Sequence, residues 1–243
     1  MRDRSGWQWR RDLPGGAWLA GAAAAIFAAA ALGSPERVEE MIKAALSLDA
    51  NAKHGGVIYL EECQTCHGAQ ATGDARSVVP SLAGQRRLYL VKQLADFVEL
   101  ERESPDMHRT VAAAGLDAPQ AVLDVATYLN EQPALQRPQT GDGSAVQLGE
   151  GVFREQCASC HGDDARGDED GSTPSLRNQH YAYLLQQMRA IGAGHRSDID
   201  PDLARFLESL DAEELAATAD YLSRLRGPVR DRRHMQDNGA VVD

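Results

Sequence analysis

The sequence predicts an all-α protein, in which two copies of one domain follow an N-terminal export or anchor helix. Three observations support this prediction. A segment that begins near Gly55 recurs at Gly149, and the two copies align at a constant offset (149 − 55 = 94). No stretch alternates apolar and polar residues in the manner of a half-buried strand. The first 34 residues place arginines before an uncharged, alanine-rich run, a pattern typical of exported chains.

The N-terminal segment, 1–34, is expected to direct the chain across a membrane. Its apolar run extends from Leu13 to Gly33 and is long enough, at about twenty residues, to span a bilayer. Positive flanks stay on the cytoplasmic side, so the rest of the chain would face the periplasm. The alanines at 29–31 would also suit a cleavage site. A removed signal peptide and a retained anchor both remain open, and the length of the run favours the anchor.

The remainder of the chain is long enough for two domains of about a hundred residues each. A short helical segment is predicted at 35–50, and it either packs on the first domain or forms a juxtamembrane stalk. The predicted boundaries of the rest are a first domain at 51–131, a linker rich in proline and glycine at 132–147, a second domain at 148–226, and a tail at 227–243. The net charge of −11 argues against a nucleic-acid-binding protein and is compatible with a basic protein partner.

One pentapeptide occurs at the same place in both copies. It reads Cys63-Gln64-Thr65-Cys66-His67 in the first copy and Cys157-Ala158-Ser159-Cys160-His161 in the second. C-x-x-C-H is the attachment signature of c-type haem. Residues i and i+3 share a helix face, so two thiols can bond one porphyrin edge while the histidine lies under the iron. The two motifs use all four cysteines. We therefore predict two covalently bound haem c groups rather than zinc or dithiol sites.

The elements around each motif are expected to be helices joined by loops. A helix leads into the motif, and a glycine-rich acidic loop follows it. A second helix is predicted at 88–100 and at 181–191, and a last helix at 119–131 and at 212–225. Asp117 and Asp211 stand where N-caps of the last helices belong, and Glu214 completes a capping box with Asp211.

Further residues repeat beyond the motifs, and together they carry a resemblance. Pro80-Ser81-Leu82 matches Pro174-Ser175-Leu176, and the pattern Gln-x-x-x-Tyr-Leu-x-x-Gln begins at Gln85 and again at Gln179. With both C-x-x-C-H-G motifs, this pattern resembles the dihaem cytochrome c4 family, which has two class I cytochrome c domains in tandem. The resemblance implies that Pro80 and Pro174 offer their carbonyls to His67 and His161. It also implies a methionine as sixth iron ligand, in the loop before each last helix.

The sixth ligand is where this chain departs from that pattern. In the first copy Met107 is the favoured ligand, and the neighbouring His108 is the alternative. The second copy has no methionine in this loop: the constant offset places Pro201 opposite Met107, whereas counting as in the family leads to Leu203. His195 as ligand and an open or water-bound iron remain equal alternatives there.

Other histidines, methionines and arginines of the chain have less direct roles. Met188 is expected in the core, and Met235 lies in the tail. His180 is expected to make a hydrogen bond, for example to a haem propionate. Arg102 and Arg196, which coincide under the repeat, are expected to be exposed or to meet propionates or a partner.

Two haems and no recognisable nucleophile or phosphate loop favour an electron carrier over an enzyme. The expected donor is a quinol-oxidising cytochrome bc complex or a periplasmic dehydrogenase, and the expected acceptor is a terminal oxidase or reductase. Membrane contact would come from the N-terminal segment. One version of this interpretation makes the chain the electron-accepting subunit of a larger enzyme. The alternative is a haem enzyme, either a peroxidase or a sulfur-oxyanion oxidoreductase, that uses an open second haem.

Overall fold

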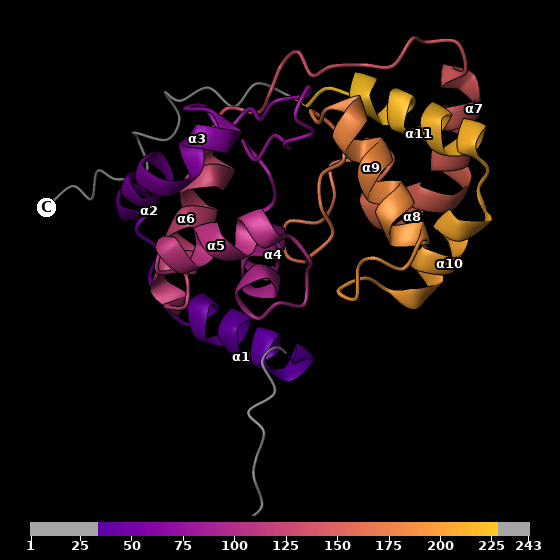
Figure 1. Ribbon diagram of the computed structural model, residues 1–243. Coiled ribbons are helices and arrows are strands. Elements are labelled where there is room, and N and C mark those ends of the chain that lie inside the picture. Colours follow the sequence, from indigo (N-terminus) through magenta and orange to yellow (C-terminus); the bar gives the residue numbers. More distant parts are fainter. Residues whose placement is uncertain (1–33, 228–243) are drawn as a thin grey trace, which may run out of the picture. The chain divides into compact units, whose positions relative to one another are not determined.

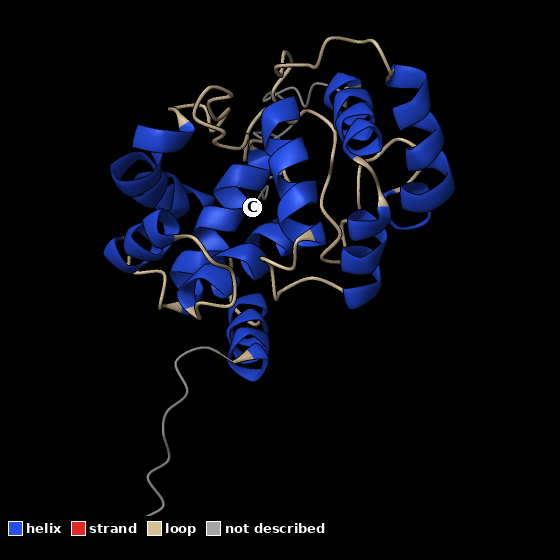
Figure 2. Ribbon diagram, turned by 45° about the vertical axis from the view of Figure 1, so that its right-hand side comes forward, coloured by secondary structure: helices blue, strands red, loops and turns tan. Residues whose placement is uncertain are grey.

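The computed structural model describes residues 34–227, and this part of the chain is helical (Figures 1 and 2). It contains no strand, and a single β-bridge joins Asp74 to Val79. The prediction of an all-α fold is therefore confirmed for the described residues. The predicted export or anchor helix and the tail beyond Gly227 lie outside them. Within 34–227, no helix is both long and apolar enough to cross a membrane.

The two copies contain the same elements in the same order. The first contains α2 (Ala52–Ile58), the π-helical turn η1 (Tyr59–Cys63), α3 (Gln64–His67), α4 (Arg87–Val98), α5 (Pro105–Ala113) and α6 (Pro119–Glu131). The second contains α7 (Val146–Val152), the π-helical turn η2 (Phe153–Cys157), α8 (Ala158–His161), α9 (Tyr181–Gly192), α10 (Pro201–Ser209) and α11 (Ala212–Arg224). The bounds of α4, α6, α9 and α11 agree closely with the predicted helices, whereas α5 and α10 are helices where the sequence predicted a ligand-bearing loop.

The helix before the first copy, α1 (Pro35–Leu46), packs on the first domain and is not a separate stalk. Its apolar face buries Val38, Met41 and Ala45 in the same core as residues of α4 and α6. Arg37 at its start forms an ion pair of 2.6 Å with Glu99. The amphipathic spacing predicted the helix. Only the tertiary structure shows which surface its apolar face covers.

In each domain the first helix crosses the last helix at a glycine. A Cβ atom at Gly55 would lie 2.0 Å from the carbonyl oxygen of Asp124 in α6, and one at Gly149 would lie 2.0 Å from that of Ala217 in α11. Only a residue without a side chain permits this approach. The crossing places the end of each first helix, and so the haem motif, at a defined position on the last helix.

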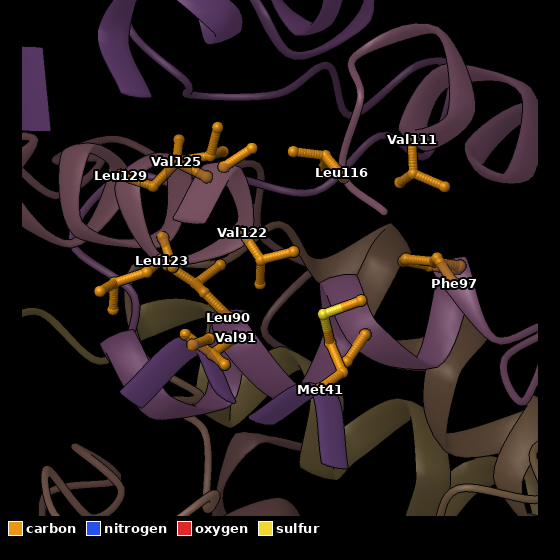
Figure 3. Packing of buried hydrophobic residues seen from close by; sticks show 14 of the residues in the cluster. Met41, Leu90, Val91, Phe97, Val111, Leu116, Val122, Leu123, Val125 and Leu129 are labelled. Carbon is orange, nitrogen blue, oxygen red and sulfur yellow. The ribbon is translucent and has the colours of Figure 1, made fainter. Parts of the chain in front are cut away.

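The core of the first domain lies between α4 and α6. Figure 3 shows Leu90 and Val91 of α4 beside Val122 and Leu123 of α6, and all four are buried. In the second domain the buried residues form two smaller clusters. One includes Phe153, Leu184 and Leu222. The other, which we call the α9–α10 cluster, is built on the buried residues Ile191, Leu207 and Leu215.

The two last helices begin differently. In α11, Asp211 accepts hydrogen bonds from the amides of Glu213 and Glu214, and the Glu214 carboxylate accepts from the amide of Asp211, so the predicted capping box is confirmed. In α6 the N-cap is Ala118, which makes no side-chain hydrogen bond, so the prediction of Asp117 as N-cap is wrong. Pro119 occupies the first helical turn, where its missing N–H costs nothing and its φ already suits a helix.

Candidate haem sites and the contact between the two domains

Each C-x-x-C-H motif lies across the junction of a π-helical turn and a short α-helix. Cys63 ends η1, and Cys66 and His67 lie in α3. Cys157, Cys160 and His161 repeat this arrangement in η2 and α8. All four thiols are free, and burial raises the pKa of Cys63 and of Cys157 to about 11. Residues 34–227 also contain no cluster of three metal-ligating side chains.

The histidine of each motif meets the carbonyl of a proline. His67 Nδ1 lies 3.2 Å from the Pro80 oxygen, and His161 Nδ1 lies 3.1 Å from the Pro174 oxygen. A carbonyl can only accept, so Nδ1 carries the proton and Nε2 keeps a free lone pair. Burial lowers the pKa of both histidines, which favours the neutral ring. A neutral imidazole with a free and oriented Nε2 is the form that binds haem iron.

A glycine holds the loop after each motif against its proline. Gly73 has a φ of 73° and Gly167 a φ of 71°, and a Cβ atom at either position would lie 2.5 Å from proline backbone atoms. The amide of Gly73 donates to the carbonyl of His67, and the amide of Gly167 donates to that of His161. This explains why a glycine stands at the same place in both copies. The loop can return to the histidine only where no side chain intervenes.

In the first domain the two predicted alternatives for the sixth ligand, Met107 and His108, make different contacts, and the ligand stays a prediction. Met107 is the third residue of α5 and packs, half-buried, against the core. The His108 ring is already engaged, because its Nε2 lies 2.8 Å from the Arg102 carbonyl and its edge contacts Phe97. The two neighbouring candidates therefore differ in whether they are available.

In the second domain the structural equivalent of Met107 is Leu203. Both α5 and α10 begin Pro-Asp, and the third residue is methionine in one and leucine in the other. The loop before α10 is longer than the loop before α5, so the constant offset led to Pro201 instead. His195 follows α9 and is exposed, and its amide donates to the Ala190 carbonyl. Met188 packs inside α9 against both core clusters of the domain, and Met235 lies outside the described residues.

Comparison with known proteins agrees with this arrangement. The family model described as "Cytochrome c" matches residues 52–132 and 146–226, one stretch for each haem motif. The chain belongs to the dihaem cytochrome c4 family. Two haem c groups, bound through Cys63 and Cys66 and through Cys157 and Cys160, follow from this membership.

Relatives of this cytochrome match both domains. The thiosulfate dehydrogenase electron acceptor of Stutzerimonas stutzeri is 32% identical over 74% of this chain and 90% of its own length. A cytochrome c4 of Thiocapsa roseopersicina is 32% identical over 72% of this chain and 90% of its own. The crystal structure of reduced recombinant cytochrome c4 from Pseudomonas stutzeri superposes with a TM-score of 0.63 at 26% identity. It covers 73% of this chain and all of that one.

The two domains of this cytochrome hold each other through a reciprocal pair of glutamines. Gln179 of the second domain accepts from the Ser81 amide at 2.9 Å and donates to the Ser81 carbonyl at 2.9 Å. Gln85 of the first domain accepts from the Ser175 amide at 2.8 Å and donates to the Ser175 carbonyl at 3.0 Å. Each serine directly follows the proline that meets the histidine of its own motif. We call these contacts the glutamine clamps.

His180 belongs to the same interface. Its Nδ1 accepts from the Gln139 amide in the linker at 3.1 Å, and its Nε2 lies 3.0 Å from the Thr72 carbonyl in the first haem loop. The predicted hydrogen bond of His180 therefore exists, but its partners are backbone groups of the protein. A propionate is not needed to satisfy the ring.

A buried polar cluster forms the other half of the interface. Asp198, whose side chain is 0% exposed, pairs with Arg196 at 2.5 Å, while Arg102 donates to Tyr183 at 3.0 Å and to Gln187 at 2.9 Å. The expectation that Arg102 and Arg196 are exposed is wrong, because the second domain covers Arg102 and the Arg196 side chain is 7% exposed. No buried side-chain polar atom among the described residues lacks a hydrogen-bond partner.

Two carboxylates in this cluster, Asp96 and Asp198, have pKa values that are shifted in opposite directions. Burial opposes ionisation of Asp198, but the hydrogen bonds and charge of Arg196 outweigh it and hold the pKa of Asp198 below its ordinary value. Burial raises the pKa of Asp96 to about 6, although Lys92 lies 2.7 Å away. The glutamines and arginines recur at the same places in both copies, but nothing in their spacing shows that they meet across the domains.

Proposed function

We propose that this dihaem electron carrier works in the periplasm and accepts electrons from a dehydrogenase that oxidises a sulfur oxyanion, with thiosulfate as the first candidate. The observation that carries the proposal is the match to a thiosulfate dehydrogenase electron acceptor over 90% of that protein's length, which includes both haem domains. Bound haem supplies a reversible one-electron iron couple. Two such groups in one chain match a two-electron oxidation.

The contact between the domains supports a carrier with both haems in one unit. The glutamine clamps and the hydrogen bonds from Arg102 to Tyr183 and Gln187 join the two domains, and such largely buried contacts are costly to separate. Domains held in this way keep a constant separation between their cofactors. An electron that enters at one site can then reach the other without a domain movement.

The net charge of the chain supports a partner with a basic docking face. The chain carries a formal net charge of −11, and such a surface speeds association with a basic docking face. We expect the rate of reduction by the donor to fall as ionic strength rises, because salt screens interactions between exposed charges beyond about 10 Å at 0.1 M.

The test is reduction of the haem-loaded, oxidised protein in a stopped-flow spectrophotometer. We expect purified thiosulfate dehydrogenase with thiosulfate to reduce both haems rapidly, and neither the enzyme alone nor thiosulfate alone to do so. A quinol-oxidising cytochrome bc complex with quinol is the competing donor. Fast reduction by that complex, with no reduction by the dehydrogenase, would assign the donor to the quinol pool and overturn the proposal.

The proposed location has its own test. Fractionation of cells that express the full chain is expected to place the haem-stained protein with the periplasm or the periplasmic face of the inner membrane. N-terminal sequencing of the mature protein then separates the retained anchor from the cleaved signal peptide. Recovery of the haem-loaded protein in the cytoplasmic fraction would contradict the proposed location.

A further inference from the structure

We propose that Leu203 leaves the second haem iron without a protein ligand on the side of α10, so that this position binds a small uncharged ligand such as carbon monoxide or nitric oxide. The inference goes beyond the proposed electron-transfer function and does not depend on the donor. It rests on the register of two equivalent helices and on the chemistry of the residues around one of them.

The register of α5 and α10 is set by their first turns. Each has a proline in its first turn and a polar N-cap side chain, Ser104 in α5 and Asp200 in α10, that accepts from a backbone amide of that turn. Both helices are 9 residues long. The third position therefore has the same place in each domain, and it is Met107 in α5 and Leu203 in α10. A thioether sulfur has lone pairs to offer iron, whereas the leucine side chain has none.

The other candidate ligands among the described residues of the second domain make contacts of their own. Met188 takes the core position that Leu94 takes in the first domain, and it packs against both apolar clusters. The His180 ring uses both nitrogens in hydrogen bonds to Gln139 and Thr72. His195 is exposed at the end of α9, where its backbone closes the helix.

The surroundings of Leu203 define the class of ligand. Leu203 packs in the α9–α10 cluster, with Ile191, Leu207 and Leu215 buried and Ile199 and Phe206 partly buried around it. The side chains of this cluster are hydrocarbon except for the thioether of Met188. Transfer of an anion into such surroundings without a partner is costly, whereas an uncharged diatomic molecule loses little hydration. We therefore expect carbon monoxide to bind and azide to bind far more weakly.

The test uses the full, haem-loaded chain with carbon monoxide as the probe. For the reduced wild-type protein we expect one carbon monoxide per chain, from absorption titration. For the oxidised protein we expect half of the iron to be high-spin by electron paramagnetic resonance. Leu203→Met should abolish carbon monoxide binding and turn the high-spin signal into a low-spin one. Met107→Leu, the matched change in the first domain, should raise binding to two per chain.

Several results would overturn the inference. Wild-type protein that takes up no carbon monoxide and is entirely low-spin has a protein ligand on both irons, and the variants Met188→Leu, His195→Ala and Met235→Leu would then show which side chain supplies the second one. A Leu203→Met variant that is correctly folded and haem-loaded, yet still binds one carbon monoxide, would show that α10 does not face the iron. Haem content and circular dichroism verify the folding of each variant.

Discussion

Replacing Gln179 by alanine tests the glutamine clamps most directly. Gln179 and Ser81 are both almost completely buried, and the amide of Gln179 satisfies both the N–H and the carbonyl of Ser81. The change leaves two buried backbone groups without these partners. An unsatisfied buried group costs about 1–3 kcal/mol, so for two groups we expect the contact between the domains to weaken by about 2–6 kcal/mol.

The same variant should also act on the first haem. Ser81 follows Pro80, whose carbonyl accepts from His67 Nδ1 at 3.2 Å. When Ser81 is released, this hydrogen bond weakens and the imidazole donates less charge to the iron. The oxidised iron is then less stabilised than before relative to the reduced iron. A difference of about 0.5–1 kcal/mol between the two oxidation states raises the potential by about 20–40 mV, on the scale of 59 mV for a tenfold change.

The assay is a spectroelectrochemical titration that resolves the two haems, together with thermal unfolding. Gln179→Ala should raise the potential of the first haem more than that of the second. The mirror variant Gln85→Ala should do the reverse, because Gln85 holds Ser175 beside Pro174. Gln136→Ala, at an exposed glutamine with only a local hydrogen bond, is the control and should change neither. Equal shifts of both haems in both clamp variants, or no shift at all, would refute the reasoning.

Three further predictions concern stability. Gly149→Ala should destabilise the second domain by about 1–3 kcal/mol in chemical denaturation, because its Cβ would clash with the Ala217 carbonyl. Gly151→Ala on the same helix, with open space around it, should be neutral or stabilising. Equal effects of the two substitutions would contradict the close crossing of the helices. The free energy of unfolding should fall as pH rises from about 4 to 6, because Asp96 keeps its proton up to about pH 6 only in the folded protein. Asp96→Asn should reduce this dependence of the unfolding free energy on pH. An unchanged dependence would exclude Asp96 as its source. Asp211→Ala should lower the unfolding free energy by about 1 kcal/mol through loss of the capping box. Asp117→Ala should have little effect, because Asp117 is not the N-cap of α6. A loss of the same size in Asp117→Ala would contradict the observed N-caps.

Local spacing was enough for the features that lie within a few residues of one another. The five residues of each haem motif contain both thiols and the histidine, and their chemistry does not depend on the rest of the chain. The repeat and the helical periodicity were readable for the same reason, since each helix buries the face that its own sequence makes apolar. The capping box at Asp211 involves residues three apart. Where local signals competed, as between Asp117 and Ala118 before Pro119, the prediction failed by one residue.

The residues that form the contact between the domains lie far apart in the sequence. Gln179 meets Ser81 at a separation of 98 residues, and Arg102 meets Gln187 at a separation of 85. The repeat showed that these residues recur, but not that each side chain reaches into the other copy. By itself the sequence determined the fold class, the duplication and the two haem c motifs, because these follow from short-range spacing. Only the tertiary structure decided that the arginines are buried, that α1 packs on the first domain, and that Leu203 stands where Met107 stands, because each depends on how distant segments pack.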